Sequence, residues 1–549
     1  MKLSLFNLIV ILAFSFRQGT AQTVSDIQKI EKLISAGIRV AYKSSVKVSV
    51  YDTLRKKTSS VFSGVVVSAD GRVLTAAHAS KPNEIYLIQF NDGKSALGKG
   101  LGRIAIKEKE RNLDLAMIQI QDKGEWPFAE MGSTSTLKLN QPTISISYPG
   151  STVGQLPNIR FGVVSGTDVN SGYFESTCKM EPGDSGGPIY DIEGKLLGIH
   201  SWIKISEDDN YEVPINLYRK YWTALSMPVD YKTYPDTTIW QNNKTTAIEI
   251  APIQSLKKMP KRLTGSTVVL NSKIKGVDCT TLGTLIKFTE AGRVLNYIIS
   301  KSSQTGIGVL LTHKGSEIAV KVLARDKEND LVMLEAPKSL NVKAVKLENK
   351  DTVNVTFDKL GKFLFSPFSN DQHYTSVLSS QFTQMPRRFS VGYFGANARF
   401  IDQKITITDI AKGSPAANLL KLRDQITGIN GKAISRPPEY GSELSKYLVG
   451  DSITVEAMRD GKEIQLKIGL TQYNGRNHIA DKFMGGRSDV SDGFSKVLFH
   501  DGTIPAAKCG GPVFDMEGNF YGINIARYSR TITVIMPATV IIDFIKKNG

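Results

Sequence analysis

Two stretches of the chain share one frame of glycines, proline and apolar residues. GGPIYDIEGKLLGI occupies residues 186–199, and GGPVFDMEGNFYGI occupies residues 510–523. Three further blocks recur ahead of them in the same order: GRVL at 71–74 and 292–295, RNLDLAMIQI at 111–120 echoed by ENDLVMLEA at 328–336, and residues 143–166 echoed more faintly by residues 362–380. Four blocks in one order indicate an internal duplication, so we expect two similar domains.

The residue pattern inside each copy predicts strands. From Val46 onward, short alternating runs such as VKVSVYD, EIYLIQF and TISISYP are separated by Gly, Asn, Asp and Ser. Such runs are typical of strands, and many strands with few helices indicate an all-β barrel or sandwich. An amphipathic helix is expected over residues 22–36 and a closing helix over residues 216–227, while polar residues 235–250 predict a linker.

The second copy contains more chain than the first. Many more residues separate Asp330 from Cys509 than separate Asp114 from Ser185, which requires an inserted domain. The insertion contains VGYFGANARF, GSPAA, D-x-I-x-x-I-N-G and R-D-G-K-E in that order, and it resembles a PDZ domain over residues 386–471.

The N-terminus predicts export from the cytoplasm. It has a lysine, an apolar run from Leu5 to Phe16 and small residues ending at Ala21. This pattern predicts a secretory signal peptide over residues 1–21 and no integral membrane segment after its cleavage. A retained membrane anchor is the alternative, but the apolar run is too short to span a bilayer.

Cysteine content and charge narrow the function further. Cys178, Cys279 and Cys509 are too few for a disulfide framework, although one bridge remains possible. The net charge of +17 favours contact with anionic surfaces such as lipid headgroups or envelope polymers. The basic residues are scattered, so we do not expect nucleic-acid binding. No cofactor and no metal site is predicted.

Three residues of the first copy suit acyl transfer by a serine. Ser185 lies in GDSGGP, where glycines allow a tight turn and let backbone N–H groups approach a substrate carbonyl. His78 ends LTAAH, on an apolar strand that leads into a polar loop. Asp114 stands between leucines in NLDLAMI, where a buried carboxylate needs a partner such as an imidazole N–H.

With LTAAH, DLAMI and GDSGGP, the order His78, Asp114, Ser185 resembles the trypsin-like serine proteases of the chymotrypsin fold. The resemblance implies that Ser185 is the nucleophile, His78 the general base and acid, and Asp114 the residue that orients the base. It also implies an oxyanion hole formed by the N–H groups of Gly183 and Ser185.

The same resemblance suggests substrate contacts. GIHSW matches the family's substrate-pairing strand and places Ser201 and Trp202 along the cleft. The position of Lys179 ahead of Ser185 places it at the floor of the specificity pocket, where it would favour acidic side chains; the alternative is that it points to solvent. Digestive members pair the residue equivalent to Asp184 with a newly cut N-terminus, but no activation sequence precedes this domain. Its partner is therefore left open.

The expected secretion, the lack of structural disulfides and the PDZ segment resemble the HtrA/Deg group of envelope proteases. In that group a PDZ loop binds peptide C-termini through backbone N–H groups while the peptide adds as a strand. Tyr393, Phe394, Gly395 and Ala396 match this carboxylate-binding loop. Here, however, the PDZ segment interrupts the second copy and does not directly follow the protease, which leaves its coupling to catalysis open.

The second copy departs from the catalytic pattern. Aligning GRVLTAAH with GRVLNYII places Ile299 at the position of His78, whereas Asp330 keeps the acidic position. Cys509 stands for Ser185 and Lys508 for Asp184. An isoleucine cannot accept a proton, and His500 is the one nearby candidate base. We therefore expect a catalytically inactive copy; an active cysteine protease is the alternative.

Together these features predict a mainly β protein with two chymotrypsin-like double β-barrel domains in tandem, the second interrupted by a PDZ domain. The expected parts are a signal peptide (1–21), a trypsin-like serine protease domain (22–235), a linker (236–262), the first part of a degenerate protease-like domain (263–385), a PDZ-like domain (386–471) and the second part of the degenerate domain (472–549).

The predicted function is that of a secreted or periplasmic serine endopeptidase that cleaves unfolded or exposed protein segments. Its PDZ and degenerate regions would capture substrates or support assembly, with homo-oligomers possible. A non-enzymatic peptide-binding or chaperone-like envelope protein is the alternative, and a binder of anionic polymers is a third.

Overall fold

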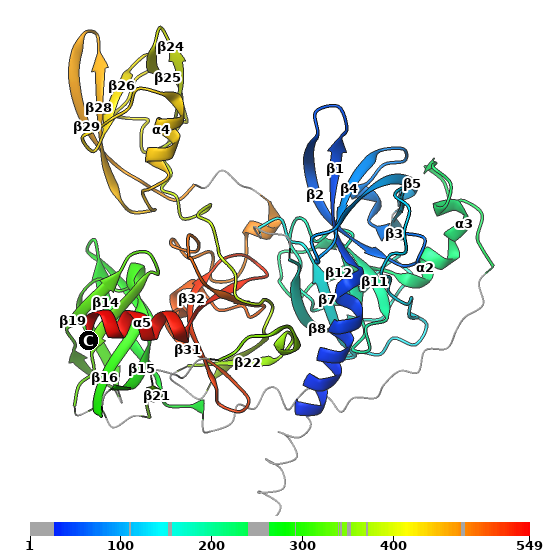
Figure 1. The fold of residues 1–549 in the computed structure, drawn as a ribbon, viewed down its shortest axis with the longest axis horizontal. Helices are drawn as coiled ribbons and strands as arrows, with labels where there is room; N and C mark the ends of the chain where they lie inside the picture. Colours follow the sequence, from blue (N-terminus) through cyan, green and yellow to red (C-terminus); the bar gives the residue numbers. More distant parts are fainter. Residues whose placement is uncertain are drawn as a thin grey trace, which may run out of the picture.

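The computed structural model describes residues 27–108, 111–151, 156–239, 263–290, 292–313, 315–338, 340, 343–348, 353–368, 372–473 and 478–549. The predicted signal peptide and most of the predicted linker lie outside these residues. Strands dominate the described chain and form two six-stranded barrels in the first copy, two related sheets in the second, and a separate sheet in the PDZ segment. This confirms the predicted fold class (Figure 1).

The first copy begins with a closed barrel of six antiparallel strands. These are β1 (Ser45–Asp52), β2 (Lys57–Val66), β3 (Arg72–Thr75), β4 (Ile85–Gln89), β5 (Ser95–Lys107) and β6 (Asn112–Ile120). The ring runs β1-β2-β3-β6-β5-β4 and closes because β4 pairs with β1. Short strand β13 (Asp230–Tyr231) adds to β5 in parallel. Alternate residues of β5 are buried, as expected for strands that face a barrel core on one side.

A second closed barrel completes the first copy. Its strands are β7 (Pro142–Ser147), β8 (Asn158–Gly166), β9 (Phe174–Ser176), β10 (Pro188–Tyr190), β11 (Leu196–Ile203) and β12 (Asn210–Pro214). The short helices α2 (Ile215–Lys220) and α3 (Trp222–Leu225) follow, in agreement with the predicted closing helix. Closure removes the sheet edges that would otherwise need covering.

The second copy repeats the first barrel with one interruption. Its strands are β14 (Thr267–Ile274), β15 (Val277–Glu290), β16 (Arg293–Lys301), β17 (Ile307–His313), β18 (Ser316–Ala319), β19 (Val322–Asp326), β20 (Leu331–Glu335) and β21 (Val345–Glu348). Strand β18 pairs with β17 and β19 pairs with β20, so together they take the place of the long β5. Val320 and Lys321, between them, still bond to these neighbours through the backbone.

The last sheet of the second copy is a half-barrel. It contains β22 (Phe363–Pro367), β23 (His373–Val377), β30 (Leu498–His500), β31 (Pro512–Asp515), β32 (Phe520–Arg527) and β33 (Thr533–Pro537), followed by helix α5 (Ala538–Asn548). The order matches that of β7 to β12. Where β8 pairs with β9 in the first copy, the isolated bridges Leu378–His500 and Thr383–Val497 join the two ends here.

The PDZ segment enters between β23 and β30, at the place of the short β8–β9 loop of the first copy. It contains β24 (Ala396–Ile401), β25 (Lys404–Ile410), β26 (Gln425–Ile429), β27 (Lys432–Ala433), helix α4 (Pro437–Leu444), β28 (Ser452–Arg459) and β29 (Lys462–Gly469). Its buried residues form their own hydrophobic cluster, and in Figure 1 it stands apart from the barrels. The insertion therefore leaves the barrel core intact.

A helix through residues 27–41 joins the two copies. Its buried isoleucines, Ile27, Ile30, Ile34 and Ile38, form one apolar face, as expected for an amphipathic helix. The helix contacts the first copy near Ile192 and the second near Gly361, and Phe363 N–H donates to Glu31 Oε1. One hydrophobic cluster runs through this helix and both copies, so the two copies pack as one body.

Candidate active site

His78, Asp114 and Ser185 come together at the junction of the two barrels of the first copy. His78 lies in a 3-10 turn directly after β3, and Asp114 lies in β6. Ser185 comes from the second barrel, in the turn between β9 and β10. His78 and Ser185 line a cleft of about 700 Å³. The arrangement therefore depends on both barrels.

His78 and Asp114 are held in a fixed relation. Asp114 Oδ1 accepts the backbone N–H of His78 at 2.8 Å, and Oδ2 lies 2.7 Å from His78 Nδ1. The Ser201 hydroxyl also donates to Oδ2. Burial alone would lower the pKa of His78, but the hydrogen bond and charge of Asp114 outweigh it and raise the pKa. Nε2 is thereby left to exchange a proton in the cleft.

The turn around Ser185 exposes two unpaired backbone donors. Asp184 N–H bonds to Glu181 O and Gly186 N–H to His200 O, whereas the N–H groups of Gly183 and Ser185 have no acceptor among the described residues. Gly183 has φ +101°, and a Cβ there would lie 2.3 Å from Gly150 N, so this position requires glycine. These two N–H groups match the expected oxyanion donors.

The Ser185 hydroxyl has no hydrogen-bond partner in the described part of the chain. Ser185 itself is half-buried at the cleft. Catalytic hydrogen bonds are often long before a substrate binds, so the missing bond to His78 does not argue against their pairing.

Arg160 is the partner of Asp184 that sequence reasoning missed. Its two terminal nitrogens bond to the Asp184 carboxylate at 2.8 and 2.7 Å, and both side chains are withdrawn from water. Ser147 Oγ and Glu181 N–H donate to the same carboxylate. An arginine inside the apolar strand run NIRFGVV was the available signal, because a buried guanidinium needs an anion.

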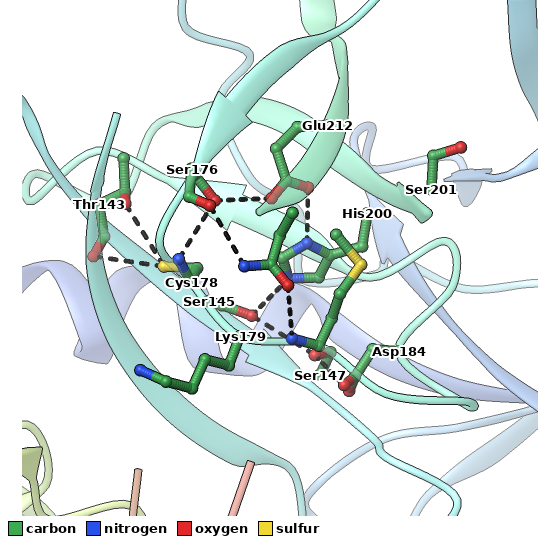
Figure 2. Close-up of polar contacts among 12 residues, drawn as sticks. Thr143, Ser145, Ser147, Ser176, Cys178, Lys179, Asp184, His200, Ser201 and Glu212 are labelled. Carbon is green, nitrogen blue, oxygen red and sulfur yellow. Dashed lines mark hydrogen bonds and ion pairs between the residues drawn. The ribbon is translucent and has the colours of Figure 1, made fainter. Parts of the chain in front are cut away.

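Of the expected substrate contacts, Ser201 and Trp202 line the cleft and Lys179 does not. The Trp202 ring stacks on Tyr211 at 3.8 Å between centroids. Figure 2 shows that Lys179 extends away from Ser201. Its side chain lies mostly buried, and its Nζ lies 3.8 Å from Asp208 Oδ1. The structure therefore corrects the placement of Lys179 at the pocket floor. The reason is that its ammonium group lies near the carboxylates of Asp208 and Asp501 instead.

A buried polar network supports the floor of the site (Figure 2). His200 Nδ1 lies 2.6 Å from Glu212 Oε2, and His200 Nε2 lies 2.6 Å from Ser145 Oγ. All three side chains are shielded from solvent, so the network has no access to substrate. The backbone of His200 bonds to Gly186 and Gly187, which follow the nucleophile position. The network therefore fixes the strand under the serine turn.

In the second copy, Ser303 occupies the position of His78, which corrects the alignment to Ile299. Ser303 N–H and Oγ bond to Asp330 at 2.7 and 2.8 Å, as His78 N–H and Nδ1 bond to Asp114. GRVL lies at the hairpin tip in both copies, but the strand that begins there has 4 residues in the first copy (β3) and 9 in the second (β16). The residue at the end of the strand therefore lies further from GRVL in the second copy. Ile299 is instead buried in the barrel wall.

Other groups fill the rest of the corresponding region of the second copy. Lys301 is fully buried, and its Nζ bonds to Asp330 Oδ2 at 2.6 Å and to the carbonyl oxygens of Val490 and Ile525. Cys509 is buried, burial raises its thiol pKa, and its N–H bonds to Ala506 O. The donor equivalent to Ser185 N–H is thus already occupied.

His500 is not placed to act as a base for Cys509, and Lys508 does not replace Asp184. His500 bonds to Asn524 and to Gly502 N–H, away from Cys509, and burial lowers its pKa to about 4. Lys508 is exposed, so it cannot replace the buried Asp184.

In the PDZ domain, the predicted carboxylate loop leads directly into β24. Tyr393 pairs with Thr471 through the backbone, while the N–H groups of Phe394 and Gly395 have no acceptor among the described residues. The Tyr440 hydroxyl of α4 donates to the carbonyl of Ala396, where β24 begins, and bridges helix and strand at this end.

Comparison with known proteins identifies two of the domains. The family model for the trypsin-like peptidase domain matches residues 62–199, and that for the PDZ domain matches residues 392–470. A DegP-like periplasmic serine endoprotease of Marinomonas sp. is 22% identical over 417 residues, covering 73% of this chain and 78% of that protein. An HtrA-like serine protease of Staphylococcus epidermidis is 28% identical over 246 residues, covering 40% of each.

A crystal structure of the serine endoprotease from Yersinia pestis aligns with 80% of this chain and 98% of its own, at 15% identity and a TM-score of 0.30, which is too low to relate individual residues. The chain therefore contains a trypsin-like peptidase domain and a PDZ domain, and its similarity to HtrA- and DegP-like serine endoproteases supports a serine-type endopeptidase.

Proposed function

We propose that the first copy hydrolyses peptide bonds in unfolded or exposed protein segments through His78, Asp114 and Ser185. Ser185 Oγ attacks the substrate carbonyl carbon while His78 Nε2 accepts the hydroxyl proton. The oxyanion receives hydrogen bonds from Gly183 and Ser185 N–H. His78 then donates its proton to the leaving amine, and water releases the acyl group from Ser185 by the reverse sequence.

The observation that carries this proposal is the combination of an oriented imidazole and two unpaired backbone donors at one open cleft. The Asp114 carboxylate orients His78 and favours its protonated form, which a general base needs in the transition state. A protein that only binds peptides has no chemical need for this combination.

The second copy is proposed to be catalytically inactive. Ser303 cannot act as the general base, Lys301 already neutralises Asp330, and the Cys509 thiol is buried with a raised pKa. We assign it the roles of scaffold and PDZ carrier.

The PDZ domain is proposed to bind the C-termini of peptides through Phe394 and Gly395 N–H. A fluorescent decapeptide with a free C-terminus should then bind more tightly than the same peptide amidated. Replacement of Gly395 by alanine should abolish this difference, since a Cβ there would lie 2.1 Å from Ser414 Cβ. Equal binding of the acid and the amide would contradict the assignment.

The periplasmic location in the name of the DegP-like relative supports a location in the bacterial envelope, which the predicted signal peptide would serve. None of the described helices is long and apolar enough to cross a membrane. Release of a fusion to this N-terminus into the periplasm would test export. Possible homo-oligomers can be measured by light scattering on the exported protein.

A fluorophosphonate probe tests the catalytic proposal directly. Folded wild-type protein should be labelled at Ser185 and should digest a denatured protein, and Ser185→Ala should lose both activities. Cys509→Ser provides the matched control in the second copy and should keep both. Absence of labelling in folded wild type would favour the non-enzymatic peptide binder, whereas salt-sensitive retention on anionic polymers alone would favour the third candidate.

A further inference from the structure

The cleft of the first copy contains residues from a distant part of the chain. His478 and Ile479 line it together with His78, Ser185 and Trp202. Both come from the segment between the PDZ domain and β30. His478 Nδ1 accepts the N–H of Ala480 at 3.1 Å and so begins a 3-10 turn at the cleft.

Glu207 of the first copy anchors this segment. It lies in the loop of residues 204–209, directly after the cleft-lining end of β11. Glu207 Oε1 accepts the N–H of Met484 at 2.8 Å, and Oε2 accepts Arg527 of the second copy at 2.7 Å. Glu207 is the one residue of this loop that is buried. The loop thus has a single buried side chain, that of Glu207. The partners of this side chain lie in the second copy and in the segment that precedes β30.

Arg527 connects the same elements from the other side. Its guanidinium is fully buried, bonds to Gly502 O and Arg530 O, and lies 5.2 Å from the centroid of the Phe483 ring. Arg530 in turn donates to the carbonyls of Ile205 and Ser206, in the Glu207 loop.

A loop that packs next to the cleft is held in the same way. Tyr528 Oη donates to Ser151 O at 2.6 Å, and Arg388 donates to Gly150 O at 2.8 Å. Gly150 N–H bonds to Pro182 O, next to Gly183. The loop held by these contacts therefore bonds to Pro182, the residue directly before Gly183, which is a proposed oxyanion donor.

We propose that Glu207 and Arg527 are positioning residues that seat the 478–484 segment as a wall of the substrate cleft, so that the second copy completes the extended substrate site of the first. This inference rests on the proposed proteolytic function. A buried ion pair suits this role because removing one partner leaves the other charge uncompensated and releases both the loop and the segment. The inactive copy then contributes to substrate binding without a catalytic group of its own.

Kinetics on the full-length protein test the inference. A quenched fluorescent peptide long enough to span the cleft, taken from a wild-type cleavage site, reports binding along the wall. Fluorophosphonate labelling reports the triad and the oxyanion donors alone. Arg527→Met and His478→Ala should each raise KM for the peptide about tenfold while labelling rates change less than about twofold. Arg527→Lys should recover part of the loss.

Two controls separate positioning from general destabilisation. Lys546→Ala changes an exposed residue near the end of α5, outside the 478–484 segment, and should leave KM unchanged. Lys362→Met breaks ion pairs with Asp515 and Glu517 outside the cleft and should lower Tm without changing KM. An unchanged KM in both Arg527→Met and His478→Ala overturns the inference, as does a KM increase in Lys362→Met equal to that in Arg527→Met. Should Arg527→Met fail to fold, His478→Ala decides.

Hydrogen exchange distinguishes this inference from the proposed function. Amides of residues 204–209 and 478–484 should exchange faster in Arg527→Met than in wild type, whether or not the protein is active. Unlabelled wild type with this exchange pattern would reject the protease function and keep the positioning contact. Labelled wild type with unchanged exchange and unchanged KM would reject the positioning role alone.

Discussion

Arg160 and Asp184 form a two-pronged ion pair directly beneath the turn that carries Ser185. Neither side chain is exposed, and the Asp184 carboxylate also accepts Ser147 Oγ and Glu181 N–H. An internal cation thus fills the role for which the sequence offered no partner. Because Arg160 is part of β8, the pair forms as soon as the second barrel closes and requires no cut N-terminus.

Arg160→Met should therefore inactivate the protease by releasing the Ser185 turn. An unpaired buried carboxylate destabilises by about 3–5 kcal/mol, and kcat/KM should fall at least about a hundredfold. Urea unfolding and the rate of fluorophosphonate labelling measure the two effects. The double variant Arg160→Met/Asp184→Asn should regain stability, since it leaves no uncompensated charge. Wild-type labelling in Arg160→Met would contradict the positioning role of the pair.

The His78–Asp114 pair predicts a pH dependence of activity. The base must be neutral, so kcat/KM should rise with pH through the His78 pKa, which lies above its usual 6.5. Asp114→Asn removes the group that raises this pKa and should move the midpoint to lower pH while lowering the plateau. The pH profile of peptide cleavage measures both changes. An unchanged midpoint in Asp114→Asn would show that another group controls the titration.

The three cysteines, all free thiols, should differ in reactivity. Burial raises the pKa of Cys178 to about 12 and also raises that of Cys509, whereas Cys279 is only half-buried. Because the thiolate is the reactive form, iodoacetamide should label Cys279 first in the native protein. Peptide mapping after a short pulse checks the order, with urea-unfolded protein as the control. Rapid native labelling of Cys509 would revive the cysteine-protease alternative.

Docking of the N-terminal helix should weaken as pH rises. Burial is the largest effect and raises the pKa of Glu31 from 4.5 to about 7. It outweighs the Phe363 hydrogen bond and the Lys362 charge, which lower the pKa, while the Glu517 and Asp515 charges add smaller increases. Between these values the folded state holds more protons than the unfolded state, so the free energy of unfolding falls with increasing pH. The contribution is full below about pH 4.5 and lost above about pH 7.

Glu31→Gln should remove this dependence. Between pH 5 and pH 8 the free energy of unfolding should fall more for wild type than for Glu31→Gln. Parallel curves for the two proteins would mean that Glu31 titrates normally.

Much of the architecture could be predicted from the sequence because it depends on local patterns. Alternating apolar runs predicted the strands, the repeated GGP frame predicted the duplication, and GSPAA with its companions predicted the PDZ insertion. His78, Asp114 and Ser185 could be chosen because each lies in a short motif whose neighbours suit its chemistry.

Other features depend on pairing and packing between distant residues. The register of β16 against β20 decided that Ser303, and not Ile299, takes the place of His78, since GRVL marks a hairpin tip whose distance from the site depends on strand length. Lys179 does not lie at the pocket floor, because its ammonium group lies near the carboxylates of Asp208 and Asp501, which are distant from the motif in sequence.

The sequence by itself determined a duplicated β protein with a PDZ insertion and one complete set of protease residues. Only the tertiary structure decided that Glu207 meets Arg527, 320 positions away, and that the 478–484 segment borders the cleft. These contacts join segments that are far apart in the sequence, because a charge that is buried when the domains pack needs a partner of opposite sign. A short sequence pattern does not show which residue that partner is.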